Sequence, residues 1–497
     1  SSINNIALIT LEGSGMVGIP GFSKRLFESL SNEQINVILI TQSSSEHSIS
    51  VAIDRSAVSK ALSAVDAMFA NEIALQKVDP LKVEEDLSII AVVGENMRHH
   101  TGVSGRMFSS MGRNGINVRA IAQGSSEKNI SAVISTADVK KAVNVLHEEF
   151  FGNSAKQVHV FVAGLGNVGS KLLSQLHKQT AFLESELSLK IHVAGLMNSR
   201  KMLISEKGIK LDDWQNELNQ SEKANLHSFI ENIIALNLPN SVFVDITANA
   251  EVSDVYASLL KKSISVVACN KIAASSVYSN YQQLKETARE YNTSFLFETN
   301  VGAGLPIIGT IHDLVRSGDR IHKMQAVLSG TLNFVFNNYD GSRPFADVVK
   351  QAQDEGYTEP DPRLDLGGTD VMRKILILAR EAGQKMEFSE IANQSFMPEA
   401  CMQGTVEDFY KSMKNHESHF AALLEGAKKE GAILKFVATY ENGKASVGLQ
   451  HIPPQHDLYH LYGKDNVVLF YTDRYQAQPL VIKGAGAGAE VTASGVF

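Results

Sequence analysis

The pattern of apolar and polar positions repeats in the first third of the chain. Residues 21–53 and 102–134 align without a gap, and about half of the aligned positions are identical. Each copy shows a short apolar strand, a stretch with apolar residues at i, i+3 and i+4, two further strands and a closing helical segment, expected near 56–71 and 138–150. The pattern therefore predicts a β-α-β-β-α unit, the ferredoxin-like order, present twice.

Two glutamines occupy equivalent places in the copies. Gln42 and Gln123 each follow a predicted strand, and Ser-Ser-Glu comes within the next four residues. This favours a paired small-molecule sensor, although duplicated structural padding stays open as an interpretation. The whole segment resembles the ACT regulatory domain, which occurs in pairs in aspartate kinases. That resemblance implies that the two glutamines line an amino-acid effector site.

A different pattern begins after residue 154. A β-rich run at 158–162 leads directly into a GxGxxG motif, and a helical stretch follows at 170–176. The motif consists of Gly164, Gly166, Asn167, Val168 and Gly169 together with the intervening Leu165. Between a strand and a helix, these glycines permit a tight turn and a close approach of a pyrophosphate to the backbone. Dinucleotide binding is therefore favoured over a purely structural glycine turn.

The ends of the next strands suggest which dinucleotide binds. The strand at 191–196 is followed by Asn198, Ser199 and Arg200, with no acidic residue to repel a 2′-phosphate. NADP is favoured and NAD stays possible, while the alternative for Arg200 is a solvated surface side chain. Strands at 241–246 and 264–268 lead to Thr247 and Lys271, at the sheet edge where ligands bind in open parallel sheets.

Two polar loops follow. Residues 298–306 combine Glu298 with glycines and a proline, which is compatible with a hard-cation site or with a simple turn. Residues 356–374 crowd charged groups before an apolar helix at 371–379, where Asp370 and Lys374 share a face. An exposed salt bridge would explain that pair, but the dinucleotide fold instead suggests a polar amino-acid substrate and a proton donor.

Composition narrows the class of protein. A chain of 497 residues corresponds to about three or four domains. With 44% hydrophobic and 20% charged residues, disorder and coiled coil are poor interpretations, and no apolar run reaches the roughly 18 residues of a membrane span. The net charge of −8 argues against nucleic-acid binding. Cys269 and Cys401 are too few for a disulfide framework or a zinc site, which favours a reducing, cytoplasmic setting.

The motifs occur in a familiar order. GLGNVG, CNKIAAS, ETNVGAGLP and GYTEPDPRLDLGGTDVMRK resemble homoserine dehydrogenase in order and approximate spacing. With the paired ACT-like repeats, nearly the whole chain resembles the C-terminal two-thirds of bifunctional aspartokinase–homoserine dehydrogenases. A kinase start motif is absent, so we expect the regulatory and dehydrogenase part of a longer chain.

The resemblance implies a mixed α/β and α+β multidomain fold. It comprises two ferredoxin-like ACT domains, a Rossmann NAD(P)-binding domain and an α+β catalytic and dimerisation domain. The expected boundaries are 1–82 and 83–154 for the ACT domains, 155–300 for the cofactor domain, 301–465 for the catalytic domain and 466–497 for a return to the cofactor domain. The expected assembly is a homo-oligomer, a dimer or tetramer, paired through a second sheet within 323–449.

The resemblance also implies a reaction and roles for residues. Aspartate 4-semialdehyde and NAD(P)H would give homoserine reversibly, with threonine as the effector. Lys374 would donate the proton and Asp370 would orient Lys374. Lys271 would lie between the cofactor and the substrate. The remaining expected ligands are Glu359 and Asp365 for the substrate ammonium, and Glu298 with the carbonyls of Val301, Ala303 and Leu305 for a monovalent cation such as sodium.

The sequence departs from the family pattern at two positions, and two alternative functions stay open. The family often has an acid where this chain has Leu364 and an alanine where it has Met372, which makes the role of Asp365 less secure than that of Glu359. Another NAD(P)-dependent semialdehyde dehydrogenase would need a cysteine nucleophile, for which Cys269 is the candidate. A catalytically inert amino-acid sensor is the other alternative, although Glu359, Asp370 and Lys374 are all present.

Overall fold

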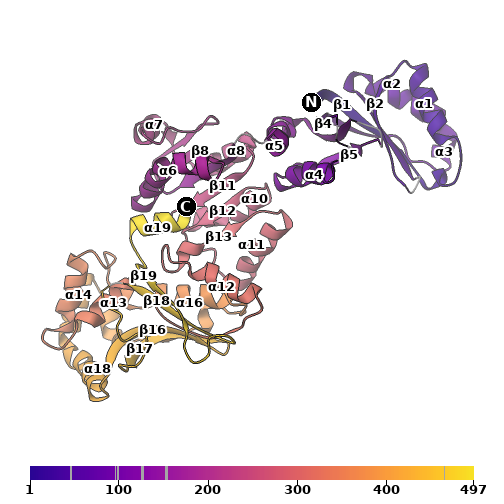
Figure 1. Ribbon diagram of the computed structural model, residues 1–497. Helices are drawn as coiled ribbons and strands as arrows, with labels where there is room; N and C mark the ends of the chain where they lie inside the picture. The colour runs from indigo at the N-terminus through magenta and orange to yellow at the C-terminus, as the bar shows by residue number, and fades with distance from the viewer. Residues whose placement is uncertain (45–46, 96, 98–99, 125–127, 152–154, 464) are drawn as a thin grey trace. The chain divides into compact units, whose positions relative to one another are not determined.

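A computed structural model describes residues 1–44, 47–95, 97, 100–124, 128–151, 155–463 and 465–497 (Figure 1). The contacts divide the chain into two units. The first contains Ser1–Val158, Glu184–Lys190 and Leu236–Asn240, and the second contains His159–Leu183, Ile191–Ala235 and Ser241–Phe497. Among the helices of the described residues, none combines the length and the apolar character that crossing a bilayer requires.

The first unit is built on one six-stranded sheet in the order β2-β3-β1-β4-β6-β5. Its two central strands, β1 (Ser2–Glu12) and β4 (Lys82–Val93), begin the two sequence copies and pair antiparallel. The other elements of the first copy are α1 (Phe22–Asn32), β2 (Val37–Gln42), β3 (Ser48–Asp54), α2 (Val58–Met68) and α3 (Ala70–Ala74). Those of the second copy are α4 (Val103–Arg113), β5 (Val118–Ala122), β6 (Asn129–Ser135) and α5 (Val139–Phe151). The predicted order is therefore confirmed in both copies.

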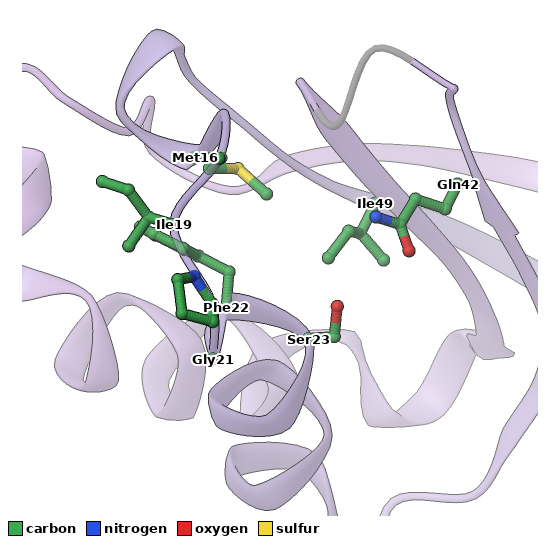
Figure 2. Close-up of a pocket in the computed structure, with 9 residues that line it drawn as sticks. Met16, Ile19, Gly21, Phe22, Ser23, Gln42 and Ile49 are labelled. Carbon is green, nitrogen blue, oxygen red and sulfur yellow. The ribbon is translucent and has the colours of Figure 1, made fainter.

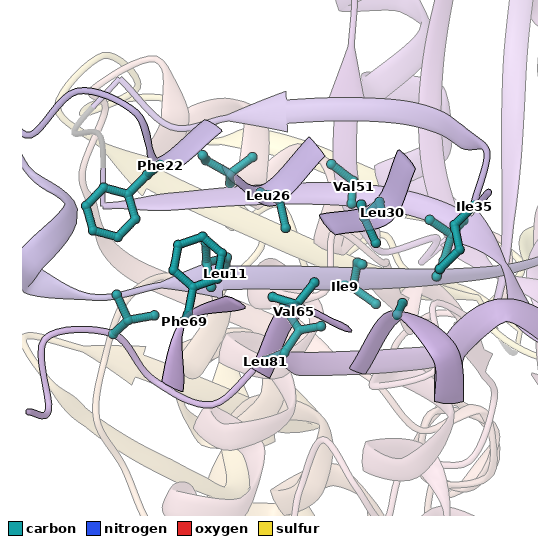
Figure 3. Packing of buried hydrophobic residues seen from close by; sticks show 14 of the residues in the cluster. Ile9, Leu11, Phe22, Leu26, Leu30, Ile35, Val51, Val65, Phe69 and Leu81 are labelled. Carbon is teal, nitrogen blue, oxygen red and sulfur yellow. The ribbon is translucent and has the colours of Figure 1, made fainter. Parts of the chain in front are cut away.

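The helices and the sheet of the first unit pack around an apolar core. The core residues on α1 follow the helical spacing that is visible in the sequence. Leu26 and Leu30 are one helical turn apart on α1, and both are buried against strand residues such as Ile9 and Val51 (Figure 3). In the first copy the predicted closing helix is divided, because the chain leaves helical geometry at Phe69 between α2 and α3. The Phe69 ring is fully buried in the same core, so packing of this ring accompanies the break.

The second unit begins with a seven-stranded sheet in the order β10-β9-β8-β7-β11-β12-β13. The strands β7, β11, β12 and β13 run parallel and alternate with helices, as in a dinucleotide-binding fold. The strands are β7 (Lys156–Ala163), β8 (Leu189–Met197), β9 (Lys201–Ile204), β10 (Glu222–Lys223), β11 (Ser241–Asp245), β12 (Ser265–Ala268) and β13 (Phe295–Leu296). The helices are α6 (Asn167–Glu186), α7 (Trp214–Gln220), α8 (Leu226–Leu236), α9 (Ala250–Asp254), α10 (Tyr256–Leu260), α11 (Tyr278–Glu290) and α12 (Ile307–Arg316).

A third sheet, also in the second unit, has the order β15-β17-β16-β14-β18-β19. Its strands are β14 (Ile321–Val327), β15 (Ala392–Gln394), β16 (Ile433–Glu441), β17 (Lys444–Ile452), β18 (Asn466–Thr472) and β19 (Leu480–Gly484). The accompanying helices are α13 (Gly330–Asn338), α14 (Phe345–Asp354), α15 (Arg363–Leu366), α16 (Thr369–Glu381), α17 (Val406–Asn415) and α18 (Glu417–Lys429). The last helix, α19 (Ala489–Val496), contacts α6, because Glu490 lies 3.1 Å from Lys171. The predicted domain boundaries stay predictions.

A buried carboxylate ties three helices of the second unit together. Glu381, near the end of α16, accepts from Lys285 of α11 at 2.7 Å and pairs with His312 of α12 at 2.5 Å. The Tyr281 hydroxyl donates to its other oxygen. Burial by itself raises the pKa of Glu381, but the His312 hydrogen bond and the Lys285 charge lower it to about 2.

We expect Glu381→Gln to lower the free energy of unfolding by about 3 kcal/mol near neutral pH, because Lys285 then loses its buried counter-charge. The folded-state pKa of Glu381 is below its unfolded value. The contribution of the Glu381 carboxylate to the free energy of unfolding is therefore present above about pH 4.5 and is lost as the pH falls toward 2. Urea unfolding at pH 7 and pH 3 measures both effects. Glu290→Gln, an exposed change on α11, is the control, and equal unfolding free energies for both variants at pH 7 would contradict the prediction.

Candidate active site

The turn between β7 and α6 can approach a phosphate closely. Gly164 has φ +99°, and a Cβ atom there would lie 2.5 Å from the Ile246 carbonyl oxygen. A Cβ on Gly169 would lie 2.1 Å from the Gly164 carbonyl oxygen, whereas one on Gly166 would meet nothing within 4 Å. Gly164 and Gly169 are therefore required by the turn itself, and Gly166 leaves open space in front of the first helical turn, which contains Asn167 and Val168.

The neighbouring strand end is a tight turn. The Asn198 side-chain oxygen accepts from the backbone N–H groups of Arg200 and Lys201, at 2.8 and 2.7 Å. Ser199 and Arg200 are exposed, and the Gly164 N–H donates to the Met197 carbonyl. The structure therefore places the 198–200 segment beside the glycine turn, with the Arg200 side chain available to a ligand.

A buried aspartate organises the adjoining strand ends. Asp245, the last residue of β11, is fully buried and accepts from the Thr247 N–H at 2.7 Å, from the Tyr256 hydroxyl at 2.5 Å and from the Asn270 amide at 3.1 Å. It therefore fixes both Thr247 and the residue that precedes Lys271. The sequence showed an acid at this strand end, but only the folded chain shows that its partners come from two loops and a helix.

Two lysines meet at one carboxylate. Asp370, in the first turn of α16, lies 2.8 Å from Lys374 and 3.3 Å from Lys271. Lys374 Nζ also donates to the Leu328 carbonyl at 2.7 Å. Burial alone would raise the pKa of Asp370, but the charges of Lys374 and Lys271 hold it well below its ordinary value. Asp370 is therefore ionised near neutral pH and contacts both lysine side chains.

Lys374 is the less exposed of the two lysines, with 12% of its side chain accessible against 31% for Lys271. Burial lowers the pKa of Lys374, Asp370 raises it, and the charge of Lys271 lowers it. The net direction is downward, which makes the ammonium a better proton donor than an exposed lysine. An acid so placed can protonate an oxygen that gains negative charge.

The loop before α16 presents carboxylates to the same region. Asp365 accepts from the Glu359 N–H at 2.9 Å and lies 3.2 Å from the Thr331 hydroxyl. Burial raises the pKa of Asp365. Its charge acts on Lys374, whereas the Glu359 side chain is exposed. Thr331 was not recognisable from the sequence, because its contact depends on α13 packing beside this loop.

The Glu298 carboxylate lies at the start of α12. Its two oxygens accept from the backbone N–H groups of Ile308 and Gly309, both at 2.7 Å. Val301 and Ala303 are buried in the turn that joins Glu298 to the helix, and Leu305 closes that turn. The sequence predicts a polar loop at 298–306, and in the structure this segment forms a turn that leads into α12.

Cys269 has the environment of an inert thiol. Burial raises the pKa of Cys269 to about 11, and the thiol accepts from the Thr299 hydroxyl at 3.1 Å. A catalytic cysteine needs the opposite shift, because the thiolate is the nucleophile. This environment disfavours a thioester mechanism.

Comparison with known proteins supplies the family. The family model for homoserine dehydrogenase matches residues 306–497, and the model for the homoserine dehydrogenase NAD-binding domain matches residues 164–298. The chain therefore contains both domains of the homoserine dehydrogenase family. The ACT domain model matches twice, at 9–69 and 90–150, so the chain carries two ACT domains before its NAD-binding domain.

Relatives share this whole arrangement. The chain is 40% identical to bifunctional aspartokinase/homoserine dehydrogenase 1, chloroplastic, of Zea mays and 37% identical to the bifunctional enzyme of Haemophilus influenzae. Both matches cover 100% of the chain, but only 54% and 61% of the relatives, so the chain spans little more than half of their length. A crystal structure of a Candida auris protein of unknown function is 34% identical, with a TM-score of 0.63, over 69% of this chain and 96% of that one.

The first ACT domain contains a cavity of about 310 Å³ at the N-terminus of α1. Ser23 and Gln42 face it from α1 and from the end of β2, and Met16, Ile19 and Ile49 supply apolar walls (Figure 2). In the second ACT domain, the equivalent Ser104 hydroxyl donates to the Gln123 side-chain oxygen at 3.1 Å. The Ser-Ser-Glu segments after the two glutamines fall largely outside the described residues, at 45–46 and 125–127.

The glycine turn yields a paired prediction. Gly166→Ala should keep the melting temperature and weaken NAD(P)H binding at least tenfold, because its methyl group would occupy open space where the pyrophosphate approaches. Gly169→Ala should lose stability as well as binding, because its Cβ collides with the Gly164 carbonyl. Fluorescence titration and thermal melting measure these effects, with Gly112→Ala on α4 as the control. Unchanged cofactor affinity in Gly166→Ala would contradict the assignment of the turn.

Proposed function

We propose that this chain catalyses the reversible NAD(P)H-dependent reduction of aspartate 4-semialdehyde to homoserine. The observation that carries the proposal is the poorly exposed Lys374 ammonium, held by Asp370 and by the Leu328 carbonyl. Lys271, which follows strand β12 of the NAD-binding domain, reaches the same carboxylate. A proton donor thus lies beside the edge at which a dinucleotide binds.

The chemistry follows from this arrangement. When bound, the cofactor supplies the hydride. As the aldehyde carbon is reduced, its oxygen gains negative charge and takes a proton from Lys374 Nζ, so that the products are the alcohol and a neutral amine. The charges of Lys374 and Lys271 stabilise the developing alkoxide, and Asp370 keeps Lys374 in place. In the oxidation of homoserine, neutral Lys374 accepts the proton back.

The substrate ammonium would lie against Glu359 and Asp365. Asp365 is fixed by Thr331 and by the Glu359 N–H, and the exposed Glu359 carboxylate is free to turn toward a ligand. Leu364, which replaces an acid often found in the family, is 63% exposed. The proposal therefore relies on the Glu359–Asp365 pair and not on Leu364 or on the buried Met372.

NADP is the proposed cofactor. The exposed Arg200 and the absence of an acid at 197–200 favour a 2′-phosphate. A hyperthermophilic archaeal homoserine dehydrogenase that is 22% identical, with a TM-score of 0.54 over 69% of this chain and 96% of that one, is described as a complex with NADPH. A monovalent cation such as sodium would use Glu298 and the Val301, Ala303 and Leu305 carbonyls, since each Glu298 oxygen keeps a second lone pair.

Regulation by threonine is the other part of the proposal. The first ACT cavity offers a glutamine amide, a serine hydroxyl and apolar walls, which suit a small amino acid with a hydroxyl and a methyl group. The proposed enzyme is a cytoplasmic homo-oligomer, a dimer or tetramer. The aspartokinase named in its relatives belongs to those longer proteins. An inert sensing module is the alternative, and turnover of the semialdehyde distinguishes the two.

Lys374→Ala should lower kcat for the semialdehyde by about 10²–10⁴-fold, because the proton donor is lost. Reduction needs protonated Lys374, so the wild-type rate should fall as the pH rises through the pKa of Lys374, below the ordinary lysine value. NADPH oxidation followed by absorbance measures both effects. Cys269→Ala and the exposed-site control Lys385→Ala should keep near-normal turnover. Near-normal turnover in Lys374→Ala would reject its role.

Gln42→Ala combined with Gln123→Ala should weaken threonine inhibition at least tenfold and leave uninhibited kcat unchanged, because both glutamines belong to the first unit and the proposed catalytic lysines belong to the second. Inhibition curves with threonine measure this effect. Gln76→Ala, in the same unit but outside the cavity, is the control. Wild-type threonine sensitivity in the double variant would exclude the two glutamines as effector ligands.

A further inference from the structure

A fully buried arginine lies at the far end of the helix that carries Lys374. Arg380 of α16 makes five hydrogen bonds, one from Nε and two from each terminal nitrogen. Four of these go to backbone carbonyls and one goes to the Glu387 carboxylate at 3.3 Å. Placing a guanidinium in the interior is costly unless all of its donors are used, and here they are.

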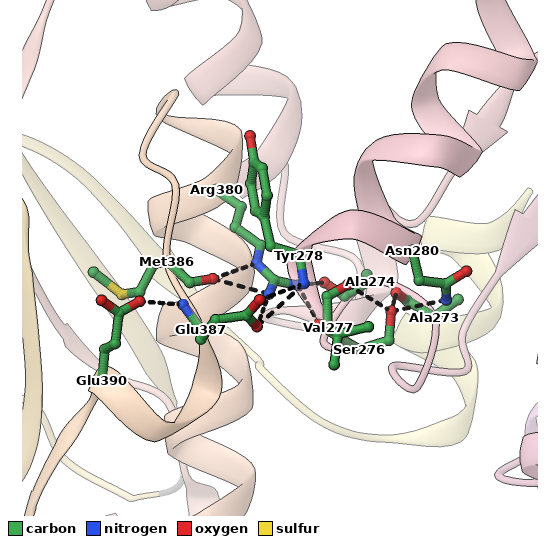
Figure 4. A network of polar contacts seen from close by, with 10 residues as sticks. All are labelled: Ala273, Ala274, Ser276, Val277, Tyr278, Asn280, Arg380, Met386, Glu387 and Glu390. Carbon is green, nitrogen blue, oxygen red and sulfur yellow. Dashed lines mark hydrogen bonds and ion pairs between the residues drawn. The ribbon is translucent and has the colours of Figure 1, made fainter.

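Two of the carbonyls belong to the segment that carries Lys271. Arg380 Nη1 donates to the Ala274 carbonyl at 3.0 Å and to the Ser276 carbonyl at 2.8 Å (Figure 4). Within the same segment, the Lys271 carbonyl accepts from the N–H and the hydroxyl of Ser275 at 2.9 and 2.7 Å. The backbone from Lys271 to Ser276 is therefore tied to itself and then to α16.

Glu387 completes the attachment. Its two oxygens accept from the Tyr278 N–H, at 3.0 and 3.1 Å, at the first residue of α11. The rings of Tyr278 and Tyr281 lie 5.5 and 5.2 Å from the Arg380 guanidinium carbon. The other contacts of Arg380 are to the Met386 carbonyl, so one side chain joins α16, the loop after it and the 271–278 segment.

Helix α16 thus contacts that segment at both ends. Its 13 residues span about 20 Å, with Asp370 in the first turn and Arg380 in the last. At the first turn, the connection is the 3.3 Å pair between Lys271 and Asp370, whose side chains are 31% and 48% exposed. An ion pair that exposed contributes little by itself and needs a fixed backbone to hold its geometry.

We propose that Arg380 is a positioning residue for Lys271. By holding the Ala274 and Ser276 carbonyls against α16, it keeps Lys271 Nζ at Asp370, and therefore keeps the positive charge of Lys271 beside Lys374. This inference rests on the proposed proton transfer by Lys374. It adds that the acidity of Lys374 depends on a side chain near the opposite end of the same helix.

The test uses the pKa of Lys374 as a reporter. The like charge of Lys271 lowers the pKa of Lys374, so displacement of Lys271 should raise it. Arg380→Met should therefore move the high-pH limit of semialdehyde reduction upward, in the same direction as Lys271→Ala, and lower kcat about tenfold. Arg380→Lys can still donate to the two carbonyls and should restore part of both changes.

A second readout does not depend on turnover. The rate of Lys374 acylation by acetic anhydride, followed by mass spectrometry across pH, reports the lysine pKa in the full chain without substrate. The acylation midpoint should rise in Arg380→Met and in Lys271→Ala, and should rise no further when the two are combined. An inactive wild-type chain would contradict the proposed function, while the acylation midpoints would still decide the role of Arg380.

A purely structural role predicts a different outcome. In that case Arg380→Met would lower the melting temperature, leave the Lys374 midpoint at its wild-type value, and multiply its loss of kcat with that of Lys271→Ala. That result would overturn the proposal. If Arg380→Met does not fold, the Lys374 acylation midpoint of Arg380→Lys distinguishes the positioning role from the purely structural role. Arg373→Met, at an exposed position of α16, is the matched control and should change neither readout.

Discussion

One carboxylate, Asp370, forms ion pairs with two lysines that come from different elements of the second unit. Lys374 comes from the same helix and Lys271 from the loop after a strand of the NAD-binding sheet. Two ammonium groups at such short range would repel each other if no anion lay between them. The attraction of the two lysines keeps Asp370 ionised, and Asp370 in turn holds Lys374, the proposed proton donor. The proposed chemistry depends on this arrangement.

Several buried polar contacts in the surrounding structure hold Asp370, Lys374 and Lys271 in place. Asp245 fixes the residue before Lys271, the Leu328 carbonyl fixes Lys374, and Glu381 joins α16 to helices α11 and α12. Each of these groups is buried and hydrogen-bonded, so each is costly to displace. Lys374 and Lys271, the proposed catalytic lysines, therefore lie on elements whose mutual positions are set by interior polar contacts in addition to apolar packing.

What the sequence could predict was local. The four-residue spacing placed Asp370 and Lys374 on one helical face, and the structure shows them in contact. The repeat gave the order of elements in the first unit, and the strand-glycine-helix pattern located the phosphate turn. The contacts of Lys271 with Asp370, of Asp245 with Asn270 and of Thr331 with Asp365 join residues far apart in the chain, so no spacing reveals them. Leu328 and Ala274 contribute only backbone carbonyls, which carry no sequence signal. The cation site at Glu298 stays a prediction, whereas the structure shows its carboxylate accepting from the N–H groups of Ile308 and Gly309 at the start of α12.

We propose that Lys374 delivers the proton while Asp370 and Lys271 hold Lys374 in place. A crystal structure of the chain with NADP and homoserine would show whether the substrate binds at Lys374. We expect the homoserine hydroxyl within hydrogen-bond distance of Lys374 Nζ, with the substrate ammonium at Glu359 and Asp365. A hydroxyl bound away from Lys374, with Asp370 no longer between the two lysines, would contradict it.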